Sequence, residues 1–159
     1  MVDYMQQYKE FEKQFGKLDS EELINQIQSF IVNHELDLQT KSKFLSLIGG
    51  IICDLSTYLK DDCGYSYFRE AIEVDANNYD AILGVCSIFN TYPYPFNKIV
   101  TEVEYLSHVE KLINDFELLE NNQKLNALQT IKSYSIFRKK IIECQGDGVI
   151  DNDGEVKIR

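Results

Sequence analysis

The chain has 159 residues, of which 16 are basic and 26 are acidic, so its formal net charge is −10. This balance argues against nucleic acid as a partner, because phosphate contacts require clustered Lys and Arg side chains. An apolar content of 44% argues against disorder and predicts a folded domain. The acidic excess has two interpretations: it keeps the protein soluble, or it attracts a basic partner.

The spacing of the apolar residues predicts an all-α fold of about seven helices, stacked as antiparallel hairpins. Pro occurs twice and Gly eight times, and such sparse punctuation favours long helices over many short strands. We expect one domain over residues 1–144. Residues 145–159 are expected to form either a short β-hairpin or a flexible tail, since Val149-Ile150 and Val156-Lys157-Ile158 flank an Asp-Gly pair.

The first three helices are predicted over residues 3–16, about 20–34, and from 37 or 40 to about 59. Asp19 is expected to cap the second helix, with Glu22 reaching back to complete a capping box, and His34 to interact with the end of that helix. The third helix is the most hydrophobic, and Gly49-Gly50 within it predicts the close approach of another helix. The inward residues of the first two helices are expected to be Met5, Tyr8, Phe11 and Phe15, and Leu23, Ile27, Phe30 and Ile31. The apolar residues of the third cover well over half of its circumference, namely Phe44, Leu45, Ile48, Ile51, Ile52, Leu55, Tyr58 and Leu59.

Two further helices are predicted on either side of Asp75-Ala76-Asn77-Asn78, a run of residues that prefer caps and turns. The loop over 91–97 holds two Pro and three aromatic residues, and it either covers the core or recognises a partner. A sixth helix is predicted over 97–120 and a seventh over 124–143. Their inward residues are expected to be Ile99, Val103, Leu106, Ile113 and Phe116, and Leu128, Ile131, Tyr134 and Ile141.

The sequence carries no pattern typical of a metal, cofactor or membrane site. Its four cysteines, at positions 53, 63, 86 and 144, lack zinc spacing, and the acidic tail does not fit an EF-hand loop. No apolar run is long enough to span a bilayer, and the amino terminus lacks the pattern of a secretion signal. We therefore expect a cytoplasmic protein with no metal, no cofactor and no membrane contact.

Residues of about 45–90 carry the pattern of a helical repeat, namely Phe68 and Ala71, the ending Ile72-Glu73-Val74-Asp75, and then Ala81. This stretch resembles the tetratricopeptide repeat, which pairs two antiparallel helices and stacks the pairs. The resemblance implies a scaffold that binds proteins. Ala76 stands where the family usually has Pro. Family members that clamp acidic peptide tails do so with Lys and Asn on the inner face of the first helix. The corresponding face here offers Ser46, Gly49, Cys53 and Ser56, so acidic tails are not the expected ligand.

The sequence also lacks a recognisable catalytic arrangement. The two histidines, His34 and His108, fall in different helices, and no phosphate loop, nucleophile elbow or zinc-protease motif is present. We therefore expect a non-catalytic protein that binds another protein. In overall character the chain resembles small acidic toxin-immunity proteins. The most concrete hypothesis is an inhibitor that neutralises a basic toxin, such as a nuclease, by covering its active cleft.

The carboxylates expected to contact that partner are Asp61, Asp62, Glu70, Glu73, Glu102, Glu104 and Glu110. Two alternatives remain open. One is an adaptor or regulatory scaffold like those of the tetratricopeptide family, which would share nearly all of these features. The other is a small-molecule-binding protein or an enzyme with a pocket near Gly49-Gly50 and Cys53.

Overall fold

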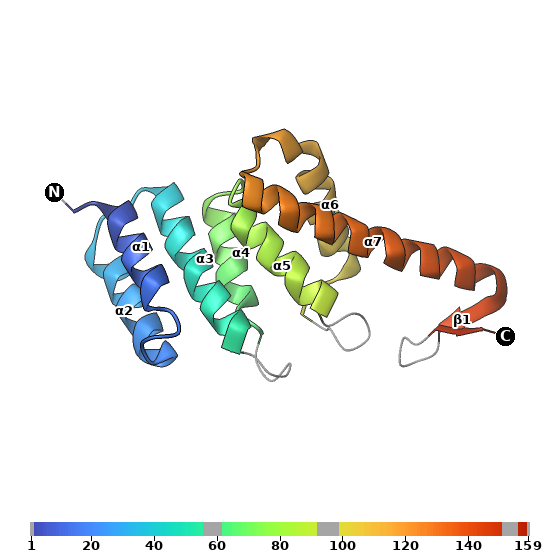
Figure 1. Ribbon diagram of the computed structural model, residues 1–159, viewed down its shortest axis with the longest axis horizontal. Coiled ribbons are helices and arrows are strands. Elements are labelled where there is room, and N and C mark those ends of the chain that lie inside the picture. The colour runs from blue at the N-terminus through green and yellow to red at the C-terminus, as the bar shows by residue number, and fades with distance from the viewer. Residues whose placement is uncertain (1, 56–61, 92–98, 151–155, 159) are drawn as a thin grey trace. The chain divides into compact units, whose positions relative to one another are not determined.

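The computed structural model describes residues 2–55, 62–91, 99–150 and 156–158. Within these residues the chain forms seven α-helices, one short 3₁₀ helix and one pair of strands (Figure 1), so the predicted all-α class is confirmed. The helices are α1 (Tyr4–Gln14), α2 (Ser20–Asn33), α3 (Leu38–Leu55), α4 (Tyr65–Val74), α5 (Tyr79–Thr91), α6 (Glu102–Asn114) and α7 (Asn121–Asp147). The 3₁₀ helix is η1 (Phe116–Leu118), and the strands are β1 (Gly148–Ile150) and β2 (Val156–Ile158).

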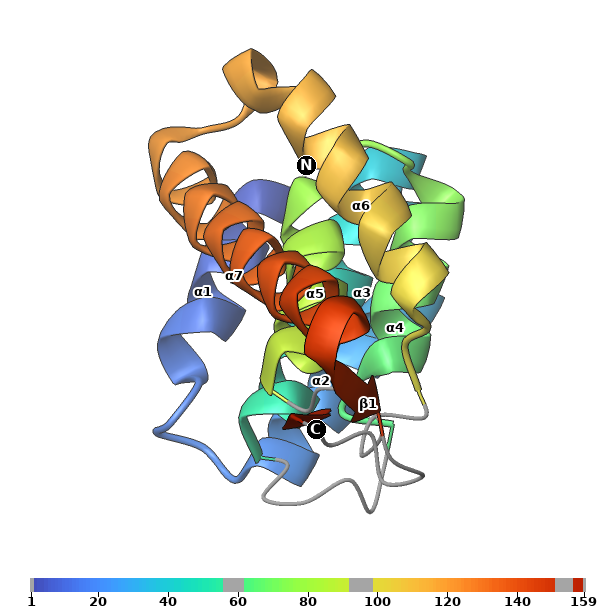
Figure 2. The same cartoon turned by 90° about the vertical axis from the view of Figure 1, so that its right-hand side faces the viewer.

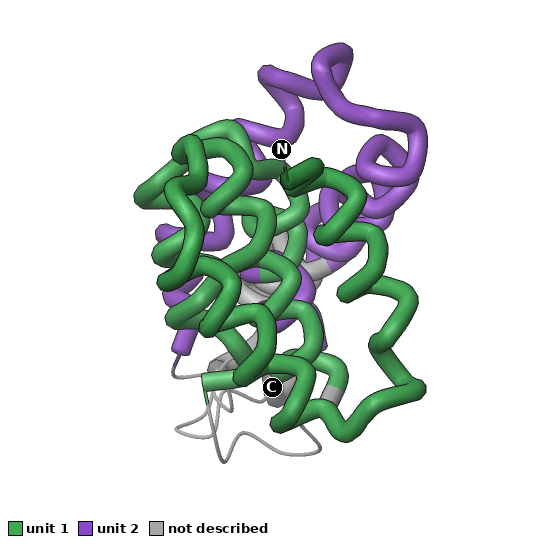
Figure 3. Tube along the Cα trace, turned by 90° about the vertical axis from the view of Figure 1, so that its left-hand side faces the viewer, with its two compact units in different colours: residues 1–84 green, residues 85–159 purple. Residues whose placement is uncertain are grey.

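The chain divides into two compact units, which Figure 3 colours separately: unit 1, Met1–Gly84, and unit 2, Val85–Arg159. The boundary falls inside α5, so each unit is described by itself. The single domain expected over residues 1–144 stays a prediction, because a compact cluster of contacts is not by itself a separately folding domain.

Aspartates begin the first three helices of unit 1. The carboxylate of Asp3 accepts hydrogen bonds from the backbone N–H groups of Met5 and Gln6, at 3.0 and 3.1 Å. Asp37 accepts from Thr40 N at 2.9 Å, and these hydrogen bonds hold the pKa of its carboxyl below the usual value. Such caps satisfy N–H groups that have no partner within the helix. They explain why the predicted starts of these helices agree with the structure.

The core of unit 1 lies between α1, α2 and α3, with α4 packed along the other side of α3. Its buried residues, all of them predicted, are Phe11, Leu23, Ile27, Phe44, Ile48 and Ile51. The prediction is wrong for Met5 and Phe15, which are 40% and 37% exposed. Phe15 follows the last residue of α1, so the helical period no longer directs its side chain inward.

A buried polar network joins α3, α4 and the start of α5. The hydroxyl of Ser42 donates to the carbonyl oxygen of Ala71 at 2.7 Å. Asn78 Nδ2 donates to Ser42 Oγ at 2.8 Å, and Asn78 Oδ1 accepts from the backbone N–H of Ala81 at 3.0 Å. Ser42 is fully buried and Asn78 is 8% exposed, so these bonds satisfy groups that water does not reach. Asn78 therefore caps α5 and also fixes the turn against α3.

Unit 2 is built around Tyr105 of α6, which is fully buried. Its ring stacks on Phe89 at 4.1 Å, and its hydroxyl donates to Asn90 Oδ1 at 2.7 Å. The same hydroxyl lies 3.2 Å from the carbonyl oxygen of Thr130 on α7, which runs beside α6 (Figure 2). Burial raises the pKa of Tyr105 to about 12. One aromatic side chain thus ties α6 to α5 and α7.

The inward faces predicted for the sixth and seventh helices are partly wrong. Val103 and Ile113 are 79% and 52% exposed, and the buried residues of α6 are Tyr105, Val109 and Leu112. On α7, Leu128 is 53% exposed, whereas its neighbour Ala127 is fully buried. On α6 the buried stripe at i, i+4 and i+7 therefore begins at Tyr105, whose ring and hydroxyl both have partners in α5.

At the carboxyl end, α7 continues to Asp147, past the predicted end at residue 143. It leads into an antiparallel hairpin in which Gly148 pairs with Ile158, and Ile150 with Val156. Of the two alternatives predicted for residues 145–159, a short β-hairpin or a flexible tail, the structure has the hairpin. The aromatic loop and the end of the third predicted helix include residues 92–97 and 56–59, which lie outside the described part of the chain.

Candidate binding groove between α1 and α2

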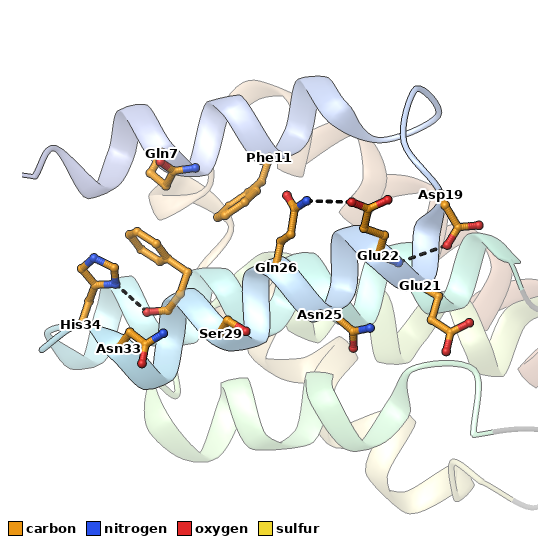
Figure 4. Close-up of a pocket in the computed structure, with 11 residues that line it drawn as sticks. Gln7, Phe11, Asp19, Glu21, Glu22, Asn25, Gln26, Ser29, Asn33 and His34 are labelled. Carbon is orange, nitrogen blue, oxygen red and sulfur yellow. Dashed lines mark hydrogen bonds between the residues drawn. The ribbon is translucent and has the colours of Figure 1, made fainter.

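A pocket of about 720 Å³ lies between α1 and α2 (Figure 4), and we call it the α1–α2 groove. Two of its residues come from α1, and the others belong to α2 and to the residues that cap it at either end. It lies wholly within unit 1. The residues that line it are Gln7, Phe11, Asp19, Glu21, Glu22, Asn25, Gln26, Ser29, Phe30, Asn33 and His34.

One end of the groove is acidic. Asp19 caps α2 and accepts a hydrogen bond from Glu22 N at 3.1 Å, as predicted. The second half of the predicted capping box is absent, because the side chain of Glu22 accepts from Gln26 Nε2 at 3.4 Å and does not reach back. Glu21 and Glu22 are both exposed. None of these three carboxylates forms an ion pair with a base in the described part of the chain.

The other end is aromatic. The His34 ring stacks on Phe30, with ring centroids 4.0 Å apart and planes inclined by 26°. His34 Nδ1 donates to the Phe30 carbonyl oxygen at 2.9 Å, which confirms the predicted contact with the end of α2. Phe30 in turn meets Phe11 edge to face at 5.8 Å. The core therefore holds both rings in a fixed orientation, while each remains only partly buried.

Between the two ends the groove offers amide and hydroxyl groups. Asn25, Gln26, Ser29 and Asn33 are exposed on α2. In Figure 4 Gln26 points towards α1, whereas Asn25 and Asn33 lie on the other side of α2, and Gln7 of α1 lies near the His34 end. Amide side chains both donate and accept hydrogen bonds, as does the peptide backbone. The groove thus combines negative charge, neutral hydrogen-bonding groups and an aromatic surface along a single helix.

The predicted site residues of unit 1 lie away from this groove, on and before α4. Asp62 accepts hydrogen bonds from the backbone N–H groups of Gly64 and Ser66, both at 3.0 Å, so it holds the turn into α4. Glu70 and Glu73 are exposed on one face of α4, and Glu73 pairs with Arg69 at 3.1 Å. Asp61 is outside the described residues.

The predicted site residues of unit 2 lie on α6 but not on one face. Glu102 and Glu104 belong to its first turn, where carboxylates are favoured by the helix dipole. Glu104 is half-buried, 3.6 Å from His108 Nε2, whereas Glu102 and Glu110 are exposed. Burial lowers the pKa of His108, and the nearby Glu104 opposes that shift. The binding role of all seven predicted carboxylates stays a prediction.

The space beside Gly49 is filled by packed side chains. A Cβ atom there would lie 2.9 Å from two ring carbons of Phe68 and 3.2 Å from the carbonyl oxygen of Gly64. The predicted close approach is therefore confirmed for Gly49, and it does not extend to Gly50, which faces open space.

Burial raises the pKa of the Cys53 thiol and raises that of Cys86 to about 12, so both thiols stay protonated near neutral pH.

The sequence does not predict the α1–α2 groove, since the run Asp19-Ser20-Glu21-Glu22 indicates only a helix cap. Within the described residues, no group of His, Cys, Asp and Glu side chains is arranged to hold a metal ion. None of the described helices has the length and apolar character needed to cross a membrane. No protein-family model, curated protein or solved structure matches the chain.

Proposed function

We propose that the protein is a non-catalytic binding protein that uses an acidic surface to occupy a basic partner protein. Its most concrete form is an inhibitor or immunity protein that covers the active cleft of a basic toxin, such as a nuclease. The observation that carries this proposal is the α1–α2 groove, whose acidic end presents Asp19, Glu21 and Glu22 without any basic partner among the described residues.

The distribution of charge supports the same proposal. Residues 1–37 hold eight acidic and three basic side chains, so they contribute five of the ten excess negative charges of the chain. A field of one sign speeds the encounter with an oppositely charged partner and disfavours partners of like charge. An inhibitor of this kind needs no catalytic group of its own, since it acts by covering the cleft.

An adaptor related in architecture to tetratricopeptide repeats is the second candidate. The close packing of α3, α4 and α5 around Gly49, Phe68 and Gly84 favours it, because small residues at such contacts let neighbouring helices approach closely. The two candidates differ in their consequence. An inhibitor abolishes the activity of its partner, whereas an adaptor leaves that activity intact and joins the partner to a third protein.

The test begins with affinity capture of the full chain from the cells that express it, at low and at high ionic strength. We expect a basic protein that is retained at low salt and released at high salt, because screening weakens exposed charge pairs. The purified partner is then titrated calorimetrically with the protein, and its activity is assayed in the complex. A partner with an acidic surface, or affinity that does not change with salt, would contradict the proposal.

A further inference from the structure

We infer that the α1–α2 groove binds an extended segment of the partner protein that carries a basic side chain at one end and an aromatic side chain at the other. This inference rests on the proposed function and adds to it the chemistry of the bound segment. Along α2 the groups that line the groove run from carboxylates through amides to aromatic rings.

The length of the groove sets the length of the segment. Asp19 and His34 stand at the two ends of α2, and this separation corresponds to about 22 Å along the helix axis at 1.5 Å per residue. An extended chain advances about 3.3 Å per residue, so about seven residues span the groove. The segment is therefore short enough to be a single loop or strand of a larger protein.

The acidic end selects the basic side chain. Glu21 and Glu22 are exposed and form no ion pair within the described residues, so a partner Lys or Arg does not have to displace a base already bound there. Arg suits this end better than Lys, because its planar guanidinium group can bind two carboxylate oxygens at once.

The aromatic end selects the second side chain. The stacked rings of Phe30 and His34 form a surface whose orientation is held by Phe11 and by the backbone hydrogen bond of His34. An aromatic side chain of the partner would add a third ring to this stack. Aromatic pairs contribute more than the burial of their surface area alone.

The middle of the groove favours an extended segment over a helix. A helix satisfies its own backbone N–H and C=O groups, whereas an extended chain needs external partners for them. Asn25, Gln26 and Ser29 supply both donors and acceptors along α2. The bound segment therefore has its backbone along α2, with its two recognised side chains at the ends.

The test uses the full chain and a synthetic heptapeptide, Arg-Ala-Ser-Ala-Ser-Ala-Phe, with blocked termini. Backbone and side-chain amide resonances are followed by NMR during a titration to millimolar peptide. We expect shifts concentrated at Asn25, Gln26, Ser29 and Asn33, and at least a fivefold weaker affinity when either Arg or Phe of the peptide is replaced by Ala. No shifts at millimolar peptide, or shifts scattered over both units, would overturn the inference.

Two double variants with the same change of charge separate local recognition from net charge. Glu21→Gln with Glu22→Gln neutralises the acidic end of the groove. The control pair, Glu12→Gln with Asp54→Asn, neutralises two exposed carboxylates of the same unit that neither line the groove nor belong to the predicted site. We expect the groove pair to weaken peptide binding about fivefold and the control pair to leave it within twofold. Equal effects would overturn the inference, and circular dichroism checks that both variants are folded.

The outcome also distinguishes this inference from the proposed function. If a basic partner binds the wild-type protein and both double variants equally well, the groove assignment fails and the proposed function stands. If the heptapeptide binds in the groove and the captured partner is not basic, the groove assignment stands and the proposed function fails.

Discussion

The Phe68 ring of α4 lies against Gly49 of α3, at a position where a Cβ atom on Gly49 would be 2.9 Å from two ring carbons. On its other side the same ring meets Gly84 of α5, where a Cβ atom would be 2.6 Å from Cζ. Real Cβ atoms do not approach ring carbons this closely, so both glycines are required for α4 to lie between its neighbours. The relationship makes Gly49 part of the helix packing.

Gly49→Ala is predicted to destabilise the protein by about 1–3 kcal/mol, because the new methyl group forces the Phe68 ring from its place. Gly50→Ala is the matched control. Gly50 is exposed on the same helix and faces open space, so the higher helix propensity of Ala is expected to stabilise the protein by up to about 1 kcal/mol. Urea unfolding of both variants measures the difference, and a loss of stability at Gly50 alone would reverse the interpretation.

The hydrogen bond between Asn78 and Ser42 is predicted to couple the two residues energetically. Asn78→Ala leaves the Ala81 N–H without its cap and the Ser42 hydroxyl without its donor, at a cost of about 2–3 kcal/mol. Ser42→Ala removes the donor to the Ala71 carbonyl and is expected to cost about 1–2 kcal/mol. A double-mutant cycle should give a coupling of at least about 0.5 kcal/mol. Strictly additive effects would argue against the network.

The register of α7 can be tested at two neighbouring positions. Leu128 is 53% exposed, so Leu128→Glu is predicted to change the free energy of unfolding by no more than about 0.5 kcal/mol. Ala127 is fully buried, and Ala127→Leu is predicted to cost about 1–3 kcal/mol through overpacking. The face predicted from the sequence requires the reverse order. Thermal or urea unfolding of the two variants decides between them.

His108 is predicted to make the protein less stable as the pH falls. Burial lowers its pKa in the folded state below that of the unfolded chain, with Lys111 adding to the shift and Glu104 opposing it. The unfolded state therefore binds more protons near its own pKa of about 6.5, and folding stability declines below that pH. The wild-type protein should lose more stability than His108→Gln between about pH 7.5 and pH 5.5. If the free energy of unfolding changed with pH equally in the two proteins, His108 would make no such contribution.

The sequence predicted the helices of unit 1 well, because their inward residues follow a strict helical period. Phe11, Ile27 and Ile48 were identified in this way, and all three are buried. In unit 2 the sequence selects the wrong stripe, because several faces of α6 and α7 carry apolar residues. The buried residues of α6, Tyr105, Val109 and Leu112, also follow the helical period. The partners of Tyr105, namely Phe89 and Asn90, lie in another helix.

The groove could not be predicted for a related reason. The apolar spacing of α1 and of α2 predicts each helix separately. It does not indicate which residues of one helix lie opposite Gln7 or Gln26 of the other. Asp19 was interpreted as a cap, and it is one. Asp19 also lies at the acidic end of the groove, and this position depends on how α1 and α2 pack together.

The most direct measurement is calorimetry of the captured basic partner with the wild-type protein and the two double variants. The account predicts that Glu21→Gln with Glu22→Gln weakens binding at least fivefold. The difference in affinity from the wild-type protein should be larger at low salt than at high salt. The account also predicts that the control pair, Glu12→Gln with Asp54→Asn, leaves the affinity within twofold. Loss of binding in the control pair alone, with full affinity in the groove pair, would contradict the account.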